Sequence, residues 1–395
     1  MTEKMTVFPW GGKCTGGLSP GCKSCQEGRS TVIFVTGMCN ATCYYCPVSL
    51  NRMFHDQAFA NEKPVSSSNE VLHEIRLCNS RAASFTGGDP LLVADRCLEF
   101  AGSIKMEFGQ EFFIHLYTPG REGSPVVFEK LSKVIDEIRF HPKLPNDVEK
   151  LVIATKYNWN VGIEVPAVPG LHKQKFFRQY VREYAEACRT NNVRFPFLNI
   201  NELEITERNF SALVNRNLII PDRDVRLGNG VSDSKEEAEA MIDYLQQNHK
   251  EINVHFCPAA QKDSVQLPNR LLHRAHSVML PSDFVVEDWT TRPVDRGLLI
   301  RGVIRFPQLS STSLPTMQQQ LQQLQDARKL MISNFNMPSD QIHVDSDKSQ
   351  LLTRADFLEE FATEIRELFS SIKVTVGMVE EYPTDDRLET SFIPF

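Results

Sequence analysis

Three cysteines near the start of the sequence have the spacing of a metal site. Cys39, Cys43 and Cys46 lie in the stretch GMCNATCYYCP, directly after the apolar run TVIFVT at 31–36. Three thiolates can hold three irons of a 4Fe–4S cluster and leave the fourth iron open to an added ligand. A structural zinc site normally has four protein ligands, so a zinc knuckle would need a distant fourth residue. The spacing therefore favours a reactive cluster.

A second motif follows about forty residues further on. The run AASFTG at 82–87 reads as a strand, and it leads into Gly87, Gly88, Asp89 and Pro90. Glycines allow a ligand or another backbone to approach closely. Such a motif by itself is usually an ordinary turn. Its place at the end of the strand that follows the cysteine loop favours a functional role.

A further three cysteines, Cys14, Cys22 and Cys25, lie in the Gly- and Pro-containing stretch CTGGLSPGCKSC. A closed site needs a fourth ligand, and Cys257 at the end of a strand-like run is the best candidate, with Cys78 as the alternative. Such a site would hold zinc, a mononuclear iron or an iron–sulfur cluster, and a structural zinc is as good an interpretation as an iron site. The cysteines in helix-like apolar patterns are expected to be buried small hydrophobic residues. They are Cys78, Cys97 and Cys188.

Short strand-like runs that alternate with helix-like segments must position these residues. The runs are 31–36, 82–87, 111–118, 136–141, 160–166, 193–200 and 251–257. Alternating strands and helices imply parallel strands joined by right-handed crossovers, and hence a full or partial (β/α) barrel. In such a barrel the chemistry collects in the loops after the carboxyl ends of the strands. The three-cysteine loop follows the first strand and stands at such a position.

The pattern changes after residue 285 to strand, helix, strand, helix, strand. This order predicts a small appended α/β domain of βαβαβ type. The predicted domains are a Cys-rich metal-binding extension at 1–30, the barrel at 31–280 and the C-terminal domain at 281–395.

Composition excludes several classes of protein. The 395-residue chain is 41% hydrophobic and 24% charged, with a formal net charge of −7, so no overall basic field indicates nucleic-acid binding. No uncharged apolar run approaches the roughly 18 residues of a membrane span, and the N-terminus does not read as a signal peptide. We therefore expect a cytoplasmic protein without membrane contact, in which reduced cysteines serve metals better than disulfides.

Together the two motifs resemble those of radical S-adenosylmethionine enzymes. Cys39-X3-Cys43-X2-Cys46, with Tyr45 before the last thiol, is similar to the family's cluster loop, and GGDP is similar to its GGEP-type motif, with Asp89 in place of the commoner Glu. In that family the cofactor chelates the open iron. One electron from the reduced cluster then cleaves its sulfonium, and the resulting 5′-deoxyadenosyl radical abstracts hydrogen from a substrate.

The resemblance implies a barrel of radical S-adenosylmethionine type, a 4Fe–4S cluster, S-adenosyl-L-methionine, and a flavodoxin- or ferredoxin-like electron donor. It implies that Gly87, Gly88, Asp89 and Pro90 hold the cofactor, with Tyr45 beside the cluster. Further runs, among them HLYTPG, DEIRFHP, EVPAVPG and LNINELE, look like an archaeal-type group related to pyruvate formate-lyase-activating enzymes.

Polar residues at the ends of other strands complete the predicted site. Tyr117 is a candidate catalytic residue by analogy with the family, or else a tyrosine that caps a layer of the barrel. A buried acid such as Glu164 needs a partner, which would be the cofactor or an internal arginine. The remaining cofactor-binding candidates interrupt strands that should be apolar, and a network at the rim is the alternative explanation for the two asparagines. These candidates are His115, Thr118, Arg139, Asn199 and Asn201.

The sequence thus predicts a radical S-adenosylmethionine enzyme with an unidentified substrate. A peptide, a protein or a small molecule is favoured over RNA because the charges of the C-terminal domain are mixed, although nucleic acid stays open. The alternative is a zinc-stabilised binding module in which both cysteine groups are structural. That alternative does not explain GGDP at a strand end or the polar run LNINELE.

Overall fold

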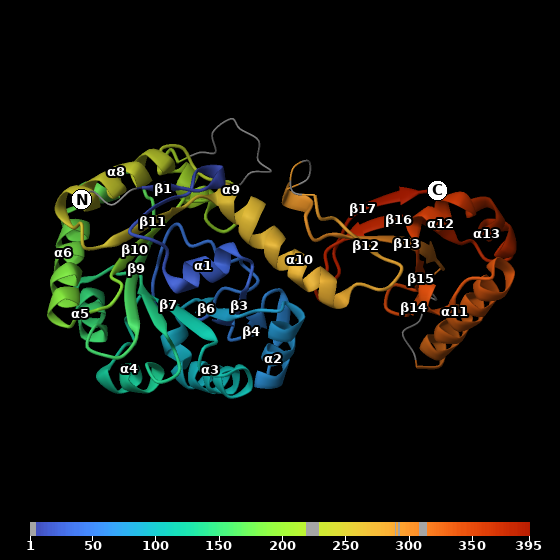
Figure 1. Cartoon of the computed structure of the whole chain (residues 1–395), viewed down its shortest axis with the longest axis horizontal. Helices are drawn as coiled ribbons and strands as arrows, with labels where there is room; N and C mark the ends of the chain where they lie inside the picture. Colours follow the sequence, from blue (N-terminus) through green and yellow to red (C-terminus); the bar gives the residue numbers. More distant parts are fainter. Residues whose placement is uncertain (1–4, 219–228, 289, 291–292, 308–313) are drawn as a thin grey trace. The chain divides into compact units, whose positions relative to one another are not determined.

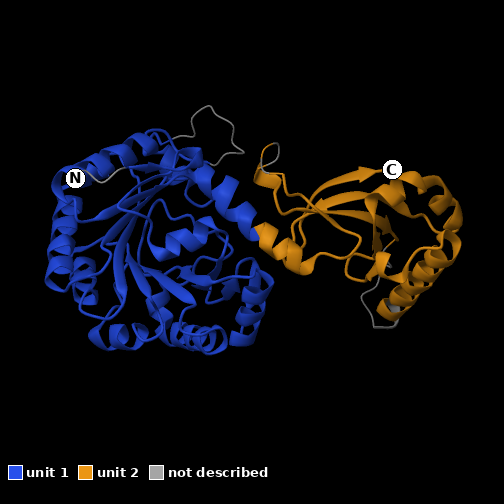
Figure 2. Cartoon of the chain, viewed as in Figure 1, with its two compact units in different colours: residues 1–270 blue, residues 271–395 orange. Residues whose placement is uncertain are grey.

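The computed structural model describes residues 5–218, 229–288, 290, 293–307 and 314–395. The chain forms two compact units, Met1–Arg270 and Leu271–Phe395 (Figure 2). The domain boundary predicted from the sequence lies between residues 280 and 281. Each unit is described by itself below.

Unit 1 is built on a sheet with a central run of parallel strands (Figure 1). In the described part of the chain these strands are β3 (Ser30–Thr36), β6 (Ala82–Gly87), β7 (Phe113–Thr118), β8 (Glu137–Phe140), β9 (Asn160–Pro166), β10 (Phe197–Asn201) and β11 (Asn253–Cys257). Their spatial order is β11-β10-β9-β8-β7-β6-β3. All seven coincide with predicted strand runs, and the predicted α/β class is confirmed.

The sheet is an open, partial barrel. At one edge β3 pairs antiparallel with β4 (Ala58–Ala60), which pairs with β5 (Lys63–Val65). At the other edge β11 pairs antiparallel with β2 (Lys13–Thr15), which pairs with β1 (Thr6–Val7). Among the described residues no pairing joins the two edges. Of the two predicted forms of barrel, the structure has the partial one.

Alternation along the strands separates an apolar outer face from a polar inner face. On β8, for example, Ile138 and Phe140 belong to the main hydrophobic core, whereas Glu137 and Arg139 point the other way. On β10, Leu198 and Ile200 join the core and Asn199 faces inward. The apolar face is covered by helices, so the functional groups are left on the concave side.

The helices of unit 1 begin at recognisable caps. The Ser67 side chain accepts a hydrogen bond from the Glu70 backbone N–H at the start of the helix Ser68–Leu77. The Ser124 side chain accepts one from the Val127 backbone N–H at the start of the helix Pro125–Leu131. The helices are α1 (Pro20–Gln26), α2 (Ser68–Leu77), α3 (Ala94–Phe108), α4 (Pro125–Leu131), α5 (Pro145–Ala154), α6 (Lys175–Thr190), α7 (Phe210–Val214), α8 (Ser234–Asn248) and α9 (Ala259–Gln261). A further helix, α10 (Leu267–Val278), contains the boundary between the two units. Short 3₁₀ turns are η1 (Pro9–Gly11), η2 (Pro90–Val93) and η3 (Leu171–Lys173), and η5 (Lys262–Gln266) is a π-helix.

The N-terminal segment is part of unit 1. Its strand β2 extends the sheet, and α1 lies on the concave side of the strands, in contact with β3, β6 and β7 (Figure 1). A Cβ added at Gly21 would come within 2.5 Å of Arg139 Nη2 and 2.8 Å of His115 Nδ1. Only glycine therefore lets α1 approach the inner face this closely.

Unit 2 contains an antiparallel sheet of order β14-β15-β13-β16-β17, with β12 paired to β13. Its described elements are β12 (Phe284–Val285), η6 (Pro293–Asp295), β13 (Leu299–Arg305), α11 (Leu314–Phe335), η7 (Ser339–Gln341), β14 (His343–Asp345), β15 (Gln350–Thr353), α12 (Ala355–Glu360), α13 (Ala362–Leu368), β16 (Thr375–Glu381) and β17 (Glu389–Pro394).

The predicted βαβαβ order omits elements of this sheet. The additional strands β15 and β17 are short, and each pairs antiparallel with the strand that precedes it in the chain. The second predicted helix of this domain is broken at Phe361, which has non-helical dihedral angles between α12 and α13. Short hairpin strands carry too few residues for periodicity to reveal them.

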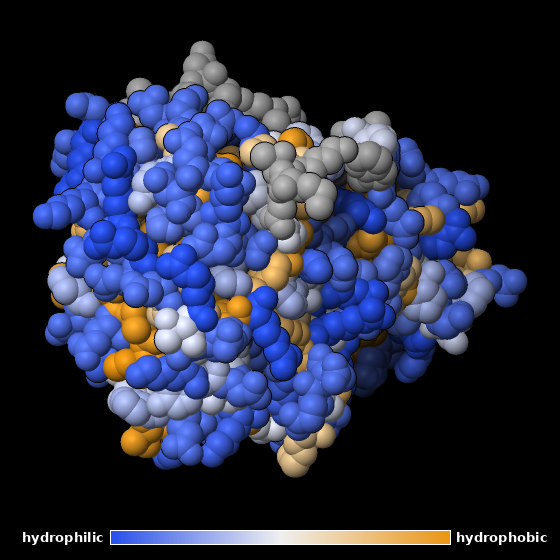
Figure 3. Space-filling model, turned by 60° about the vertical axis from the view of Figure 1, so that its left-hand side comes forward, coloured by the Kyte–Doolittle hydropathy of each residue, from blue (hydrophilic) through white to orange (hydrophobic). Residues whose placement is uncertain are grey.

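The surface is mostly hydrophilic on the face shown in Figure 3, with apolar residues in small separate groups. Within the described ranges, no helix combines the length and the apolar character needed to cross a membrane.

Candidate functional site

The GGDP motif lies directly against the start of the cysteine loop. The backbone N–H of Gly88 donates to Thr36 O at 2.8 Å, and that of Asp89 donates to Met38 O at 2.8 Å. Gly87 has a φ of +134°, and a Cβ there would lie 2.3 Å from Thr36 O. A Cβ at Gly88 would lie 2.1 Å from Met38 O. Both glycines are therefore required for the two motifs to meet.

Asp89 is a buried carboxylate with one unsatisfied oxygen. Its Oδ1 accepts hydrogen bonds from Thr118 Oγ1 at 2.7 Å and from the Leu91 backbone N–H at 3.1 Å. Its Oδ2 has no hydrogen-bond partner among the described residues. Burial raises the pKa of Asp89 to about 6, against the effect of these two hydrogen bonds. A cationic ligand such as an ammonium or sulfonium group would satisfy this oxygen.

The concave face of unit 1 encloses a cavity of about 660 Å³. The predicted site residues that line it are Cys22, Cys25, Cys43, Tyr45, Cys46, Gly87, Tyr117, Thr118, Arg139, Glu164, Asn199, Asn201 and Cys257. The predicted residues outside its lining are Cys14, Cys39, Gly88, Asp89, Pro90 and His115. The structure thus brings residues from all seven parallel strands and the cysteine loop to one space.

Arg139 organises the polar side of this cavity. Its guanidinium donates to Glu164 Oε2 at 2.8 Å, to Glu137 Oε1 at 2.7 Å and to Tyr117 Oη at 2.9 Å. Burial by itself raises the pKa of Glu164, but Arg139 and the amides of two asparagines hold it below its ordinary value. These amides belong to Asn199 and Asn201. The internal arginine expected as the partner of Glu164 is therefore Arg139.

Two predicted residues lie elsewhere. His115 is fully buried beneath α1, where a Cβ at Gly21 would meet its ring at 2.8 Å, and its Nε2 lies 3.3 Å from the hydroxyl of Tyr117, which lines the cavity. Cys14 is buried on β2, which lies between β1 and β11 in the sheet, and its thiol donates to Thr15 O at 3.7 Å. The burial of both residues could not be read from the sequence because it depends on how the N-terminal segment folds onto the sheet.

Tyr45 ties the cysteine loop to the barrel through residues that the sequence analysis missed. Its hydroxyl lies 2.7 Å from His141 Nε2 and is also hydrogen-bonded to the ammonium of Lys143, which lies 4.4 Å above the Tyr45 ring. The ring packs in a small hydrophobic cluster with Leu203 and Leu213. His141 directly follows β8, so its position after a parallel strand was the available signal.

A second missed residue, His255, lies on the same face of β11 as Cys257 and lines the cavity. It is 4% exposed, and neither ring nitrogen has a hydrogen-bond partner among the described residues. Burial lowers its pKa to about 4, so the imidazole is neutral at pH 7. Because His255 lies two residues before Cys257 in the same strand, strand alternation could have placed both on the same face.

The thiols of Cys22, Cys25 and Cys257 lie in the same wall of the cavity. Burial raises the pKa of Cys25 to about 12 and that of Cys257 to about 12 in the metal-free protein. Over the described ranges, no group of three or more His, Cys, Asp or Glu side chains is arranged so that it could hold a metal ion. The thiolates of a 4Fe–4S cluster bind different irons and need not converge on one centre.

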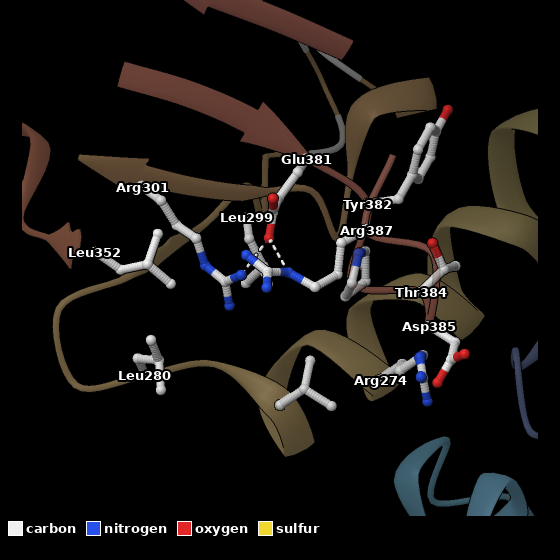
Figure 4. Close-up of a pocket in the computed structure, with 12 residues that line it drawn as sticks. Arg274, Leu280, Leu299, Arg301, Leu352, Glu381, Tyr382, Thr384, Asp385 and Arg387 are labelled. Atoms are coloured by element: carbon white, nitrogen blue, oxygen red, sulfur yellow. Dashed lines mark hydrogen bonds and ion pairs between the residues drawn. The ribbon is translucent and has the colours of Figure 1, made fainter. Parts of the chain in front are cut away.

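Unit 2 has a separate pocket of about 300 Å³ (Figure 4). Its lining combines apolar side chains, among them Leu280 and Leu299, with the charged side chains of Arg301, Glu381 and Arg387. Arg301 and Arg387 both bind the carboxylate of Glu381. Because these charges already satisfy one another, we assign no ligand to this pocket.

Comparison with known proteins gives the class of the chain. A family model described as a 4Fe-4S single cluster domain matches residues 26–122, which contain the cysteine loop and the GGDP motif. A protein of Methanocaldococcus jannaschii named "Putative glycyl-radical enzyme activating enzyme" is 31% identical over 389 residues, which is 95% of this chain and 92% of the relative. A crystal structure of Streptococcus suis SuiB bound to S-adenosylmethionine is 14% identical, covers 58% of this chain and 47% of its own, and has a TM-score of 0.36, too low to carry an argument.

The chain belongs to the family of radical S-adenosylmethionine activating enzymes. The predicted membership of this superfamily, the 4Fe–4S cluster and S-adenosyl-L-methionine are thereby confirmed, and the zinc-stabilised binding module is not. The residues present fit both cofactors. Three thiols share one loop, two glycines bring the GGDP backbone against it, and Asp89 offers an unsatisfied buried oxygen.

Proposed function

We propose that this protein abstracts a hydrogen atom from a segment of a protein partner, within the cavity of unit 1. The observation that supports the proposal is the shared cavity. Cys43 and Cys46 of the cluster loop, Gly87 of the GGDP motif and the Arg139 network all line it. A site of this size accommodates a cofactor and a few residues of a substrate.

The 4Fe–4S cluster and S-adenosyl-L-methionine together would supply the reducing electron and the radical that abstracts hydrogen. The chain itself positions them. We assign Cys39, Cys43 and Cys46 as cluster ligands, and Gly87, Gly88 and Asp89 as the residues that hold the cofactor. Tyr117, Arg139, Glu164, Asn199 and Asn201 would orient the groups bound in the cavity and replace water around them. An external one-electron donor of flavodoxin or ferredoxin type is required.

The name of the M. jannaschii relative supports a glycyl residue as the target. The α1 helix occupies part of the concave side, so an entire folded partner does not fit there. An extended segment that contains a glycine does fit, because glycine has no side chain that would exclude it from a narrow space. We therefore infer that the partner presents a glycine-containing loop.

The first experiment tests the cluster. Anaerobically reconstituted protein should form 5′-deoxyadenosine from S-adenosyl-L-methionine in the presence of dithionite, as measured by chromatography. The Cys39→Ala/Cys43→Ala/Cys46→Ala variant should lose this activity by at least about a thousandfold, because no residual ligand set holds the cluster. The Cys78→Ala/Cys97→Ala/Cys188→Ala variant removes the same number of thiols away from the cavity and should stay within about threefold of the wild type. Equal losses in the two variants would contradict the assignment.

The second experiment tests the substrate class. Extracts of cells grown in heavy water are separated into a protein fraction and a low-molecular-mass fraction, and each is incubated with the enzyme, unlabelled S-adenosyl-L-methionine and reductant. Deuterium in 5′-deoxyadenosine, measured by mass spectrometry, should come from the protein fraction. Transfer from the low-molecular-mass fraction alone would replace the protein partner by a small molecule.

A further inference from the structure

The three thiols of Cys22, Cys25 and Cys257 are not used by the proposed reaction, yet they face its cavity. Cys22 and Cys25 stand one turn apart on α1, and Cys257 is the last residue of β11. The position of α1 on the concave side of the sheet brings these distant segments of the chain together (Figure 1). Thiols that line the cavity of the proposed reaction call for a chemical explanation.

The hydrogen bonds of two of these sulfurs are those of a ligating thiolate. Cys22 Sγ accepts a hydrogen bond from Asn199 Nδ2 at 3.2 Å, and Cys257 Sγ accepts one from Gln266 Nε2 at 3.2 Å. Amide donors directed at sulfur stabilise metal-bound thiolates and tune iron–sulfur clusters. Gln266 belongs to the π-helix η5, a local irregularity of the kind often found at functional sites.

Two other buried cysteines donate instead, whereas Cys78 accepts from Asn61 Nδ2 at 3.3 Å and also donates to Glu74 Oε1 at 3.3 Å. Cys97 Sγ donates to Pro90 O at 3.4 Å, and Cys14 Sγ donates to Thr15 O. Both therefore sit in settings that suit a protonated thiol. This difference separates Cys14 from the set in which the sequence analysis had placed it.

Positive charge next to the three thiols would compensate their deprotonation. Arg139 and Lys262 line the same cavity as the three thiols. Lys262 is held by Glu204, with Nζ and Oε1 2.6 Å apart. The cavity wall thus has cations in place before any metal binds.

We propose that Cys22, Cys25 and Cys257 hold a second 4Fe–4S cluster in the wall of the cavity, with its fourth iron open to the cavity. Each thiol would exchange its proton for a bond to iron, and iron and sulfide would come from cluster assembly. A structural zinc would need a fourth ligand and a closed site. Here Cys14, which was predicted to bind a metal together with Cys22, Cys25 and Cys257, lies outside the cavity lining, and the other three residues line the cavity.

The test counts metal in the full chain after anaerobic reconstitution. The wild type should contain about eight irons and about eight acid-labile sulfides per chain, the content of two 4Fe–4S clusters. The Cys22→Ala/Cys25→Ala/Cys257→Ala variant should keep about half of both and retain the electron paramagnetic resonance signal that responds to S-adenosyl-L-methionine. The matched variant Cys14→Ala/Cys97→Ala/Cys188→Ala should keep the full content.

The reciprocal variant keeps the test decisive if the first variant does not fold. Cys39→Ala/Cys43→Ala/Cys46→Ala should retain about four irons and lose the response to S-adenosyl-L-methionine. A wild type with about four irons, stoichiometric zinc, or a reciprocal variant without any cluster would overturn the second site. Because the two clusters are counted in different variants, failure of this proposal is distinguishable from failure of the proposed function.

Discussion

Arg139 of unit 1 and Arg301 of unit 2 have the same kind of ion-pair arrangement. Each side chain is at most 5% exposed, and each is held between two carboxylates. Arg139 lies between Glu137 and Glu164, and Arg301 lies between Asp283 and Glu381. In each case a single cation compensates acids that burial would otherwise destabilise.

Their surroundings differ. Arg139 also donates to the hydroxyl of Tyr117 and lines a cavity that contains five cysteine residues. Arg301 lines a smaller pocket together with Glu381 and Arg387, which form an ion pair (Figure 4). Lys348, which is not part of that lining, also pairs with Glu381. A buried ion pair therefore does not mark a functional site by itself. A functional site is marked instead by groups beside the ion pair that are still able to bind a ligand.

The largest effect is expected from Arg139→Met, which should reduce both stability and activity. The change leaves Glu137 and Glu164 without their cation, at a cost of about 3–5 kcal/mol in the free energy of unfolding. Formation of 5′-deoxyadenosine per loaded cluster should fall by about tenfold or more, because Glu164 no longer orients the two asparagines. Urea unfolding and the cleavage assay measure the two effects. Arg189→Met, at an exposed arginine paired with Glu251, is the control and should change the free energy of unfolding by less than ~1 kcal/mol.

A smaller effect, on stability alone, is expected from Arg301→Met. Asp283 loses its guanidinium, but Glu381 keeps Arg387 and Lys348, so a cost of about 2–3 kcal/mol is expected. Cleavage per loaded cluster should match the wild type. Loss of cleavage in folded, cluster-loaded Arg301→Met protein would show that the contrast between the two arginines is wrong.

Asp89 extends the comparison, because it is a buried acid that has no arginine among its hydrogen-bond partners. Its pKa of about 6 lies above the ordinary value, so in the ligand-free protein the free energy of unfolding should fall as pH rises from about 4 to about 6, by on the order of 3 kcal/mol. The ionised form suits a cationic cofactor, so binding of S-adenosyl-L-methionine should weaken as pH falls through about 6.

Asp89→Asn should remove both pH dependences and weaken cofactor binding about tenfold at pH 7.5, the loss of one charge-assisted contact. Calorimetry and urea unfolding between pH 4 and 8 measure these effects against Asp95→Asn, at an exposed acid of α3. An unchanged pH profile in Asp89→Asn would remove Asp89 from the cofactor site.

Much of the candidate site could be predicted because its chemistry is local. The spacing of Cys39, Cys43 and Cys46 belongs to one loop, and Gly87 and Gly88 follow one strand. Strand alternation also placed Asn199 and Asn201 on one face, as the structure has them. His115 shares the inner-face alternation with Tyr117, but α1 covers it, and no pattern within its own strand could show that.

The sequence by itself therefore determined the class of the protein, the seven parallel strands and the meeting of cluster loop and GGDP motif, because these depend on neighbours in the chain and on strand order. Only the tertiary structure decided that the barrel is open, that α1 lies on its concave side, and that Cys22 and Cys25 but not Cys14 share the cavity with Cys257. These outcomes depend on packing between segments far apart in the chain, which local spacing does not encode.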